Sequence, residues 1–196
     1  MNWRAVTAKD SVVLAAYALV VGLAMLLAKY WTADRIDAHQ QRILRQTLAE
    51  VLPAANYDAA PLNNKLTLPD DNRQRVLYPV TVDNQPYAVA ITAVAPDGYA
   101  GDIEMLVGVS YDGQVTGVRV VSHHETPGLG DKIERAKSSW IISFDGTSVH
   151  DSTVWTVKKN GGDFDQFTGA TITPRAVVRS VKQTLDWFIE HRQMIF

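Results

Sequence analysis

A short loop near the C-terminus holds the residue types of an anion-binding site. The sequence DQFTGAT occupies residues 165–171 and stands just before an expected helix start at Thr173. A helix start presents unpaired backbone N–H groups and the positive end of the helix dipole, so it suits a phosphate. The small residues Gly169 and Ala170 leave the hydroxyl of Thr171 open to a bulky group. The same residues also fit an ordinary helix cap with Thr173 as the N-cap residue.

A second segment, SHHETPGLG at residues 122–130, follows a predicted strand. Its paired histidines suggest a metal site, but adjacent residues at the end of a strand point to opposite faces and chelate poorly. The proline and glycines are sufficient to make a turn. Alternatively, the glycines let backbone amides approach the edge of a flat ring, while Glu125 and Thr126 form hydrogen bonds with that ring.

Composition restricts the chemistry that is open to the chain. The 196 residues carry a formal net charge of −2, whereas nucleic-acid-binding domains usually carry a basic face, so no nucleic-acid partner is expected. The absence of cysteine excludes thiolate iron–sulfur and cysteine–zinc sites, disulfides and a nucleophilic thiol. Redox chemistry would therefore need an organic cofactor, or a haem bound without cysteine. No G-x-G-x-x-G or Walker sequence occurs, so nucleotide binding by those routes has no support.

The N-terminal part of the chain has the pattern of a membrane anchor. The uncharged apolar run at residues 11–28 would span about 27 Å as a helix, close to the thickness of the hydrocarbon core. A cleaved signal peptide is the alternative, but the run is long for one and lacks a suitable cleavage site. We therefore expect a cytoplasmic tail at residues 1–10 and a transmembrane anchor at residues 11–28. Basic residues stand on both sides of the span, so counting positive charges does not give its orientation. We expect the C-terminal part to be exported, because this is the usual outcome for an N-terminal anchor.

The remaining chain predicts an α+β domain that follows a stalk. Residues 29–53 form the expected stalk, with helical spacing of apolar residues and a stop at Pro53. Residues 54–196 form the expected domain, in which a polar covering loop at 54–73 precedes a set of hairpins, and the hairpins imply an antiparallel sheet. The expected elements are strands at 75–82, 87–95, 103–110 and 115–122, a short helix at 131–137, a short strand at 154–157, and a last helix from Pro174 to about Arg192.

The two motifs together resemble a known flavoprotein family. HETPGLG at residues 124–130 followed by D-x-x-T-G-A-T at residues 165–171 is similar to RnfG, the FMN-binding G component of the Rnf ion-translocating electron-transport complex. The resemblance extends over nearly the whole chain, including the N-terminal span. It implies FMN held by a phosphoester to Thr171, attached by an FAD-dependent flavin transferase. It also implies a single-pass protein of the bacterial inner membrane whose domain faces the periplasm, with the other membrane subunits of the Rnf complex as partners.

The resemblance also assigns site residues. Those matching the attachment motif are Thr168, Gly169, Ala170 and Thr171, and those matching the loop along the ring are Glu125, Thr126, Gly128, Leu129 and Gly130. Lys158 is a further candidate, because a cation near the N1–C2=O edge of a flavin would stabilise its reduced anion. A solvated charge is the alternative for this lysine.

The function implied is electron relay within an ion-translocating ferredoxin:NAD oxidoreductase, with no catalytic acid, base or nucleophile and no metal site in this chain. One alternative is the related flavin-carrying C component of the sodium-translocating NADH:quinone reductase, whose chain is usually longer. The other is a cofactor-free, membrane-anchored periplasmic binding or assembly module in which TGAT is only a helix cap.

Overall fold

The computed structural model describes residues 3–70 and 73–196, and it describes side chains outside residues 3–9, 32–39 and 73. Parts of the predicted tail (1–10) and of the predicted stalk (29–53) therefore lie outside the residues whose side chains are described. The chain divides into two compact units, Met1–Leu44 and Arg45–Phe196. The division of the chain at residues 10, 28 and 53 stays a prediction.

The first unit consists of most of helix α1 (Trp3–Val51). Within α1, the 22 residues Asp10–Trp31 are long and apolar enough to cross a membrane, and they enclose the predicted span at residues 11–28. Large apolar side chains of this stretch are exposed, including Leu19 at 75% and Tyr30 at 79%. Such an exposed apolar surface is typical of a segment that contacts a membrane or another protein. The helix ends at Val51, two residues before Pro53, because proline cannot continue a helix.

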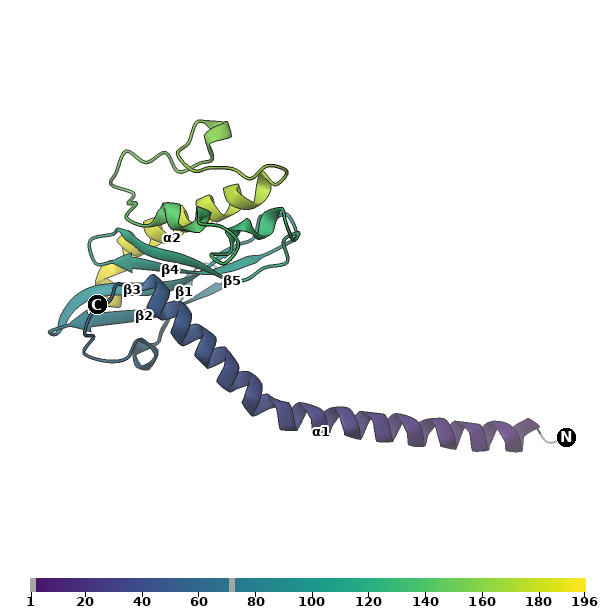
Figure 1. Cartoon of the computed structure of the whole chain (residues 1–196). Coiled ribbons are helices and arrows are strands. Elements are labelled where there is room, and N and C mark those ends of the chain that lie inside the picture. The colour runs from purple at the N-terminus through teal and green to yellow at the C-terminus, as the bar shows by residue number, and fades with distance from the viewer. Residues whose placement is uncertain (1–2, 71–72) are drawn as a thin grey trace. The chain divides into compact units, whose positions relative to one another are not determined.

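The second unit is built on a five-stranded antiparallel sheet whose strands follow one another in chain order (Figure 1). The predicted α+β fold with an antiparallel sheet is confirmed. The strands are β1 (Leu66–Asp70), β2 (Arg73–Val82), β3 (Gln85–Ala95), β4 (Ile103–Ser110) and β5 (Val115–Ser122). Asp83 and Asn84 join β2 to β3 with φ values of 53° and 58°, the left-handed backbone that a two-residue hairpin requires.

Sequence periodicity found four of these five strands and missed β1. The expected covering loop at residues 54–73 is wrong in that β1 and the 3-10 helix Pro61–Asn64 form within it. Pro69 hid the strand, because a proline breaks the ladder of a central strand. Among the described residues, β1 pairs only with β2, and it lies at the sheet edge, where the missing N–H can be tolerated.

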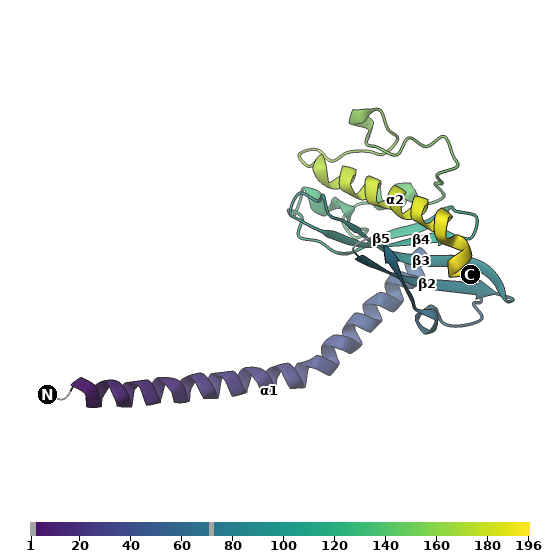
Figure 2. The same cartoon turned by 180° about the vertical axis from the view of Figure 1, so that it is seen from behind.

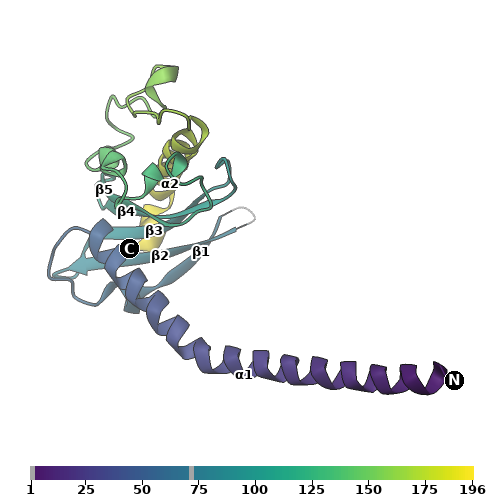
Figure 3. The ribbon, with the colours of Figure 1, turned by 45° about the vertical axis from the view of Figure 1, so that its right-hand side comes forward.

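Helix α2 (Ile172–Ile195) covers one face of the sheet (Figure 2). The long segment between β5 and α2 lies over the same side of the sheet (Figure 3), and its aromatic residues complete the core. Two expected elements of that segment are wrong. The helix at 131–137 is a 3-10 turn at Gly130–Ile133, and the strand at 154–157 is only an isolated bridge between Val157 and Phe164. The other 3-10 turns of the segment are Trp140–Phe144 and Lys158–Asn160.

The end of α1 is seated on the sheet at two glycines. Gly108 and Gly117 are cross-strand neighbours on β4 and β5, and a Cβ added to Gly108 would collide with the Val51 carbonyl. The hydroxyl of Thr116 donates a hydrogen bond to that carbonyl, one of the last of α1, which has no partner within the helix. Val51 itself is fully buried. The last turns of α1 are therefore part of the compact domain.

Candidate functional site

A cavity of about 370 Å³ opens at the N-terminal end of α2. Three segments far apart in the sequence form its walls: the loop after β3, the loop after β5, and the residues around the start of α2. Its lining residues are Tyr99, Glu125, Thr126, Leu129, Gly130, Gly169, Ala170, Thr171, Ile172 and Thr173. Residues of both sequence motifs therefore line the same cavity.

Thr171 occupies the N-cap position of α2, but its side chain makes no capping hydrogen bond. The helix starts at Ile172, so the expectation of a helix start with Thr173 as N-cap is wrong. Thr173 lies within the first turn, fully buried, and its hydroxyl is engaged elsewhere. The first N–H groups of a helix have no intrahelical acceptors. An uncommitted hydroxyl therefore lines the cavity beside a helix end that favours an anion.

Glu125 ties the three walls of the cavity together. Its side chain is only 4% exposed, and its Oε2 accepts a hydrogen bond from the Thr173 hydroxyl at 2.5 Å. Its Oε1 accepts one from the backbone N–H of Ala100 at 3.0 Å. Each oxygen of the Glu125 carboxylate has a further lone pair that could accept another hydrogen bond. The hydrogen bond expected between Glu125 and a bound ring stays a prediction. The bonds present in the structure hold the protein walls.

Glycines let these walls approach each other closely. A Cβ added to Gly130 would lie 2.7 Å from Glu125 Oε2, which leaves no space for a side chain. Gly169 has a φ of 84°, and a Cβ there would lie 3.1 Å from Leu129 Cδ2. A larger residue at Gly130 would collide with Glu125 and Thr173, and one at Gly169 would press against Leu129 of the other motif loop.

The attachment-motif loop is fixed to the core by aromatic residues. A tight turn closes where the Ala170 N–H donates to the Phe167 carbonyl at 3.2 Å, with Gly169 supplying the left-handed backbone. The Phe167 ring is buried and lies 5.0 Å from the ring of Trp140, edge to face. The indole N–H of Trp140 donates to the Asp165 carbonyl at 2.7 Å. These contacts hold the backbone that leads to Thr171 in one place.

Three predicted site residues do not line the cavity: Gly128, Lys158 and Thr168. Lys158 Nζ forms an ion pair with Asp165 Oδ1 at 2.7 Å, and both side chains are well exposed. Three lining residues were missed by the motifs: Tyr99, Ile172 and Thr173. The sequence places Tyr99 as an aromatic residue within a glycine-containing turn, which could have marked it as a candidate site residue. No local sequence pattern indicates that Thr173 is buried.

His123 supports the loop from outside the cavity lining. Its Nδ1 accepts a hydrogen bond from the Glu125 backbone N–H at 3.0 Å, and its Nε2 lies 3.0 Å from Glu134 Oε1. The bond to the amide assigns the ring proton to Nε2, which can then donate to Glu134. Both ring nitrogens are thereby used in orienting the segment that carries Glu125.

Comparison with known proteins shows to which family the chain belongs. The chain is 42% identical to the G component of the ion-translocating oxidoreductase complex of Vibrio cholerae serotype O1 (strain O395), over 95% of this chain and 92% of that protein. It is 45% identical to the corresponding protein of Pseudomonas aeruginosa (strain UCBPP-PA14), over 95% and 91%. It is 41% identical to that of Shewanella oneidensis, over 96% and 92%. The chain belongs to the RnfG family, the G components of ion-translocating oxidoreductase complexes.

Two family models match separate parts of this RnfG chain. The model for the RnfG N-terminal region matches residues 1–51, which end where α1 ends. The model for the FMN-binding domain matches residues 98–186. Every residue that lines the cavity falls within this second match. The resemblance drawn from the two sequence motifs is confirmed.

Proposed function

We propose that this chain is the electron-carrying flavin subunit of a membrane-bound ion-translocating ferredoxin:NAD oxidoreductase, and that its FMN is joined through phosphate to Thr171. The observation that carries the proposal is the uncommitted Thr171 hydroxyl. It lies at a helix start, on the wall of a cavity whose lining residues all fall within the part of the chain that matches the FMN-binding domain.

The residues around the cavity fit such a group. A volume of about 370 Å³ is within the range of roughly 300–1,000 Å³ for small-molecule sites. The unpaired N–H groups of the first turn of α2 would hold the phosphate. Leu129 and Ile172, 41% and 45% exposed, offer apolar contact to a ring. Bound in this way, FMN supplies one- and two-electron chemistry, and the phosphate link leaves its ring unmodified.

Attachment needs a second protein. In that reaction the Thr171 hydroxyl would attack the flavin-side phosphorus of FAD. The phosphoanhydride bond would break and AMP would leave, while the hydroxyl proton would pass to a base. A threonine hydroxyl is a poor nucleophile without activation. Glu125, a carboxylate on the cavity wall, is already engaged with Thr173 and Ala100. We therefore assign the base to a flavin transferase, which has to reach Thr171 over the exposed Thr168–Gly169 turn.

The chain's own residues position the flavin rather than transform a substrate, and we propose that it has no stand-alone catalytic site. The anchor within α1 would hold the domain at the bacterial inner membrane, with the domain in the periplasm. Other membrane subunits of the complex would then exchange electrons with the flavin. Lys158 would take part only after releasing Asp165.

A denaturing gel viewed under ultraviolet light tests this function. The full chain, co-expressed with a flavin transferase, should give a fluorescent band whose intact mass includes one FMN. Thr171→Ala should give a dark band, and Thr67→Ala, at an exposed threonine of β1, should stay fluorescent. A dark band for the unaltered chain would refute the proposal and favour a cofactor-free binding or assembly module.

A further inference from the structure

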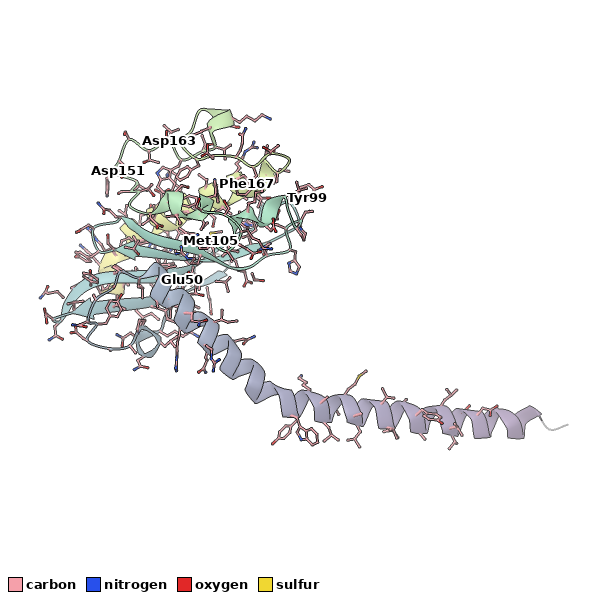
Figure 4. The ribbon with its side chains drawn as sticks, viewed as in Figure 1. Glu50, Tyr99, Met105, Asp151, Asp163 and Phe167 are labelled. Atoms are coloured by element: carbon pink, nitrogen blue, oxygen red, sulfur yellow. The ribbon has the colours of Figure 1, made fainter. Side chains whose placement is uncertain are left out.

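Tyr99 is an exposed aromatic residue on the cavity wall to which neither motif assigned a role. Its side chain is 69% exposed, although the cavity lies directly beside it. It projects from the loop between β3 and β4, at the end of the sheet where α2 begins (Figure 4). With Leu129 and Ile172, it forms the set of large apolar side chains on the cavity wall.

The backbone of the loop that carries Tyr99 is held by contacts on both sides of this residue. Glu125 Oε1 accepts the N–H of Ala100, the residue after Tyr99. Gly98, the residue before it, has no space for a Cβ, which would lie 2.9 Å from the same Oε1. Gly101 then turns the chain with a φ of 118°. The backbone on both sides of Tyr99 is thus fixed by the carboxylate that also fixes Thr173.

No described residue forms a hydrogen bond or ring contact with the Tyr99 side chain. Other tyrosines of the domain have such partners: Tyr111 lies edge-on to Phe196 at 5.6 Å, and Tyr57 lies 6.4 Å from Tyr87. The backbone that carries this unpartnered ring is already in place, so only the side chain of Tyr99 has to be ordered when a flat ligand binds.

We propose that Tyr99 packs its ring against the isoalloxazine of the flavin held at Thr171. This inference rests on the proposed function. Aromatic rings attract one another in offset-stacked and edge-to-face arrangements, and an isoalloxazine is a large, flat partner for either. Glu125 then acts as a positioning residue, because it holds the Tyr99 loop and the Thr173 end of α2 at one spacing. Tyr99 would shield one side of the flavin from water and thereby influence its potential.

The phenol of Tyr99 makes this contact measurable. A tyrosine in van der Waals contact with a photoexcited flavin donates an electron to it and then takes the electron back, so emission is quenched. A phenylalanine at the same position keeps the ring contact but is too poor a donor to quench. Attachment and ring contact can therefore be measured separately.

The experiment uses the full chain in detergent after co-expression with a flavin transferase. The fluorescent band on a denaturing gel reports attachment, and the fluorescence lifetime of the native protein reports contact. We expect Tyr99→Phe and Tyr99→Ala to remain flavinylated and to show a severalfold longer native lifetime. Only Tyr99→Ala should shift the visible absorption bands, because it removes the ring. Tyr111→Ala, a tyrosine outside the cavity lining, should match the unaltered chain.

The outcomes separate this inference from the proposed function. A flavinylated protein whose lifetime is unchanged in Tyr99→Phe and Tyr99→Ala overturns the Tyr99 contact and leaves the flavin function standing. An unaltered chain without flavin overturns both. If Tyr99→Ala alone fails to accept flavin, the lifetime of Tyr99→Phe decides the question.

Discussion

The Glu125 carboxylate accepts a hydrogen bond of 2.5 Å from the hydroxyl of Thr173, which lies 48 residues further along the sequence. This bond joins the glycine loop after β5 to the first turn of α2, and both side chains are buried. It holds the HETPGLG motif against the helix turn that follows the TGAT motif, and both partners line the cavity with Thr171. Glu125 of the first motif therefore stabilises the start of α2 in the protein without a cofactor.

Removal of the Glu125 carboxylate should loosen the site. Glu125→Ala leaves the Thr173 hydroxyl and the Ala100 N–H without an acceptor, and we expect a loss of about 1–3 kcal/mol in the free energy of unfolding. Glu125→Gln keeps one oxygen acceptor and should lose less. Chemical denaturation measures the difference, and Glu104→Ala, at an exposed glutamate of β4, serves as the control. Equal stabilities for Glu125→Ala and Glu104→Ala would contradict the role given to the buried carboxylate.

The glycine seat under α1 should not accept a larger residue. Gly108→Ala places a methyl group against the Val51 carbonyl, and overpacking of this kind costs about 1–3 kcal/mol. We expect a lower denaturant midpoint and faster proteolysis near Val51. Gly22→Ala is the matched control, since its added Cβ meets no atom within 4 Å. The seat would have no energetic importance if both variants unfolded at the same denaturant concentration.

Asp58 should make the domain sensitive to acid. Hydrogen bonds from the Thr81 side chain and then from the backbone N–H groups of Asn84 and Asp83 hold the pKa of Asp58 below its ordinary value. A carboxyl whose pKa is lowered on folding stabilises the protein above its unfolded pKa, and that contribution is lost as the pH falls through the lowered, folded value. Asp58→Asn should therefore show a weaker decrease in stability with acidification than the unaltered chain.

Urea unfolding at pH values between about 5 and about 2 measures this effect of Asp58. Asp151→Asn, at an exposed carboxylate of the long segment (Figure 4), should keep the acid dependence of the unaltered chain. Identical pH profiles for Asp58→Asn and the unaltered chain would show that folding does not lower the pKa of Asp58.

The orientation of the domain can be tested directly, because the chain has no cysteine. Ser152→Cys introduces one thiol at an exposed position of the domain. A membrane-impermeant maleimide should label it in cells whose outer membrane alone is permeabilised. Ala5→Cys, in the predicted cytoplasmic tail, should be labelled only after lysis. The reverse pattern would place the domain in the cytoplasm.

The sequence by itself determined the elements with strong local periodicity. Strands β4 and β5 match their predicted bounds, and the apolar stretch of α1 encloses the predicted span. Alternation of apolar residues and glycine-marked turns are local features, so they can be recognised without the rest of the chain. The two motifs were also sufficient to indicate the family.

Only the tertiary structure decided which residues share the cavity. Thr173 resembled a helix cap in the sequence, but its buried hydroxyl donates to Glu125, and Thr171 takes the cap position with its own hydroxyl uncommitted. Tyr99 joined the site because the β3–β4 loop lies at the same end of the sheet as the start of α2. Hydrogen bonds and contacts between residues this far apart in the sequence depend on the folded path of the chain, and no local pattern encodes them.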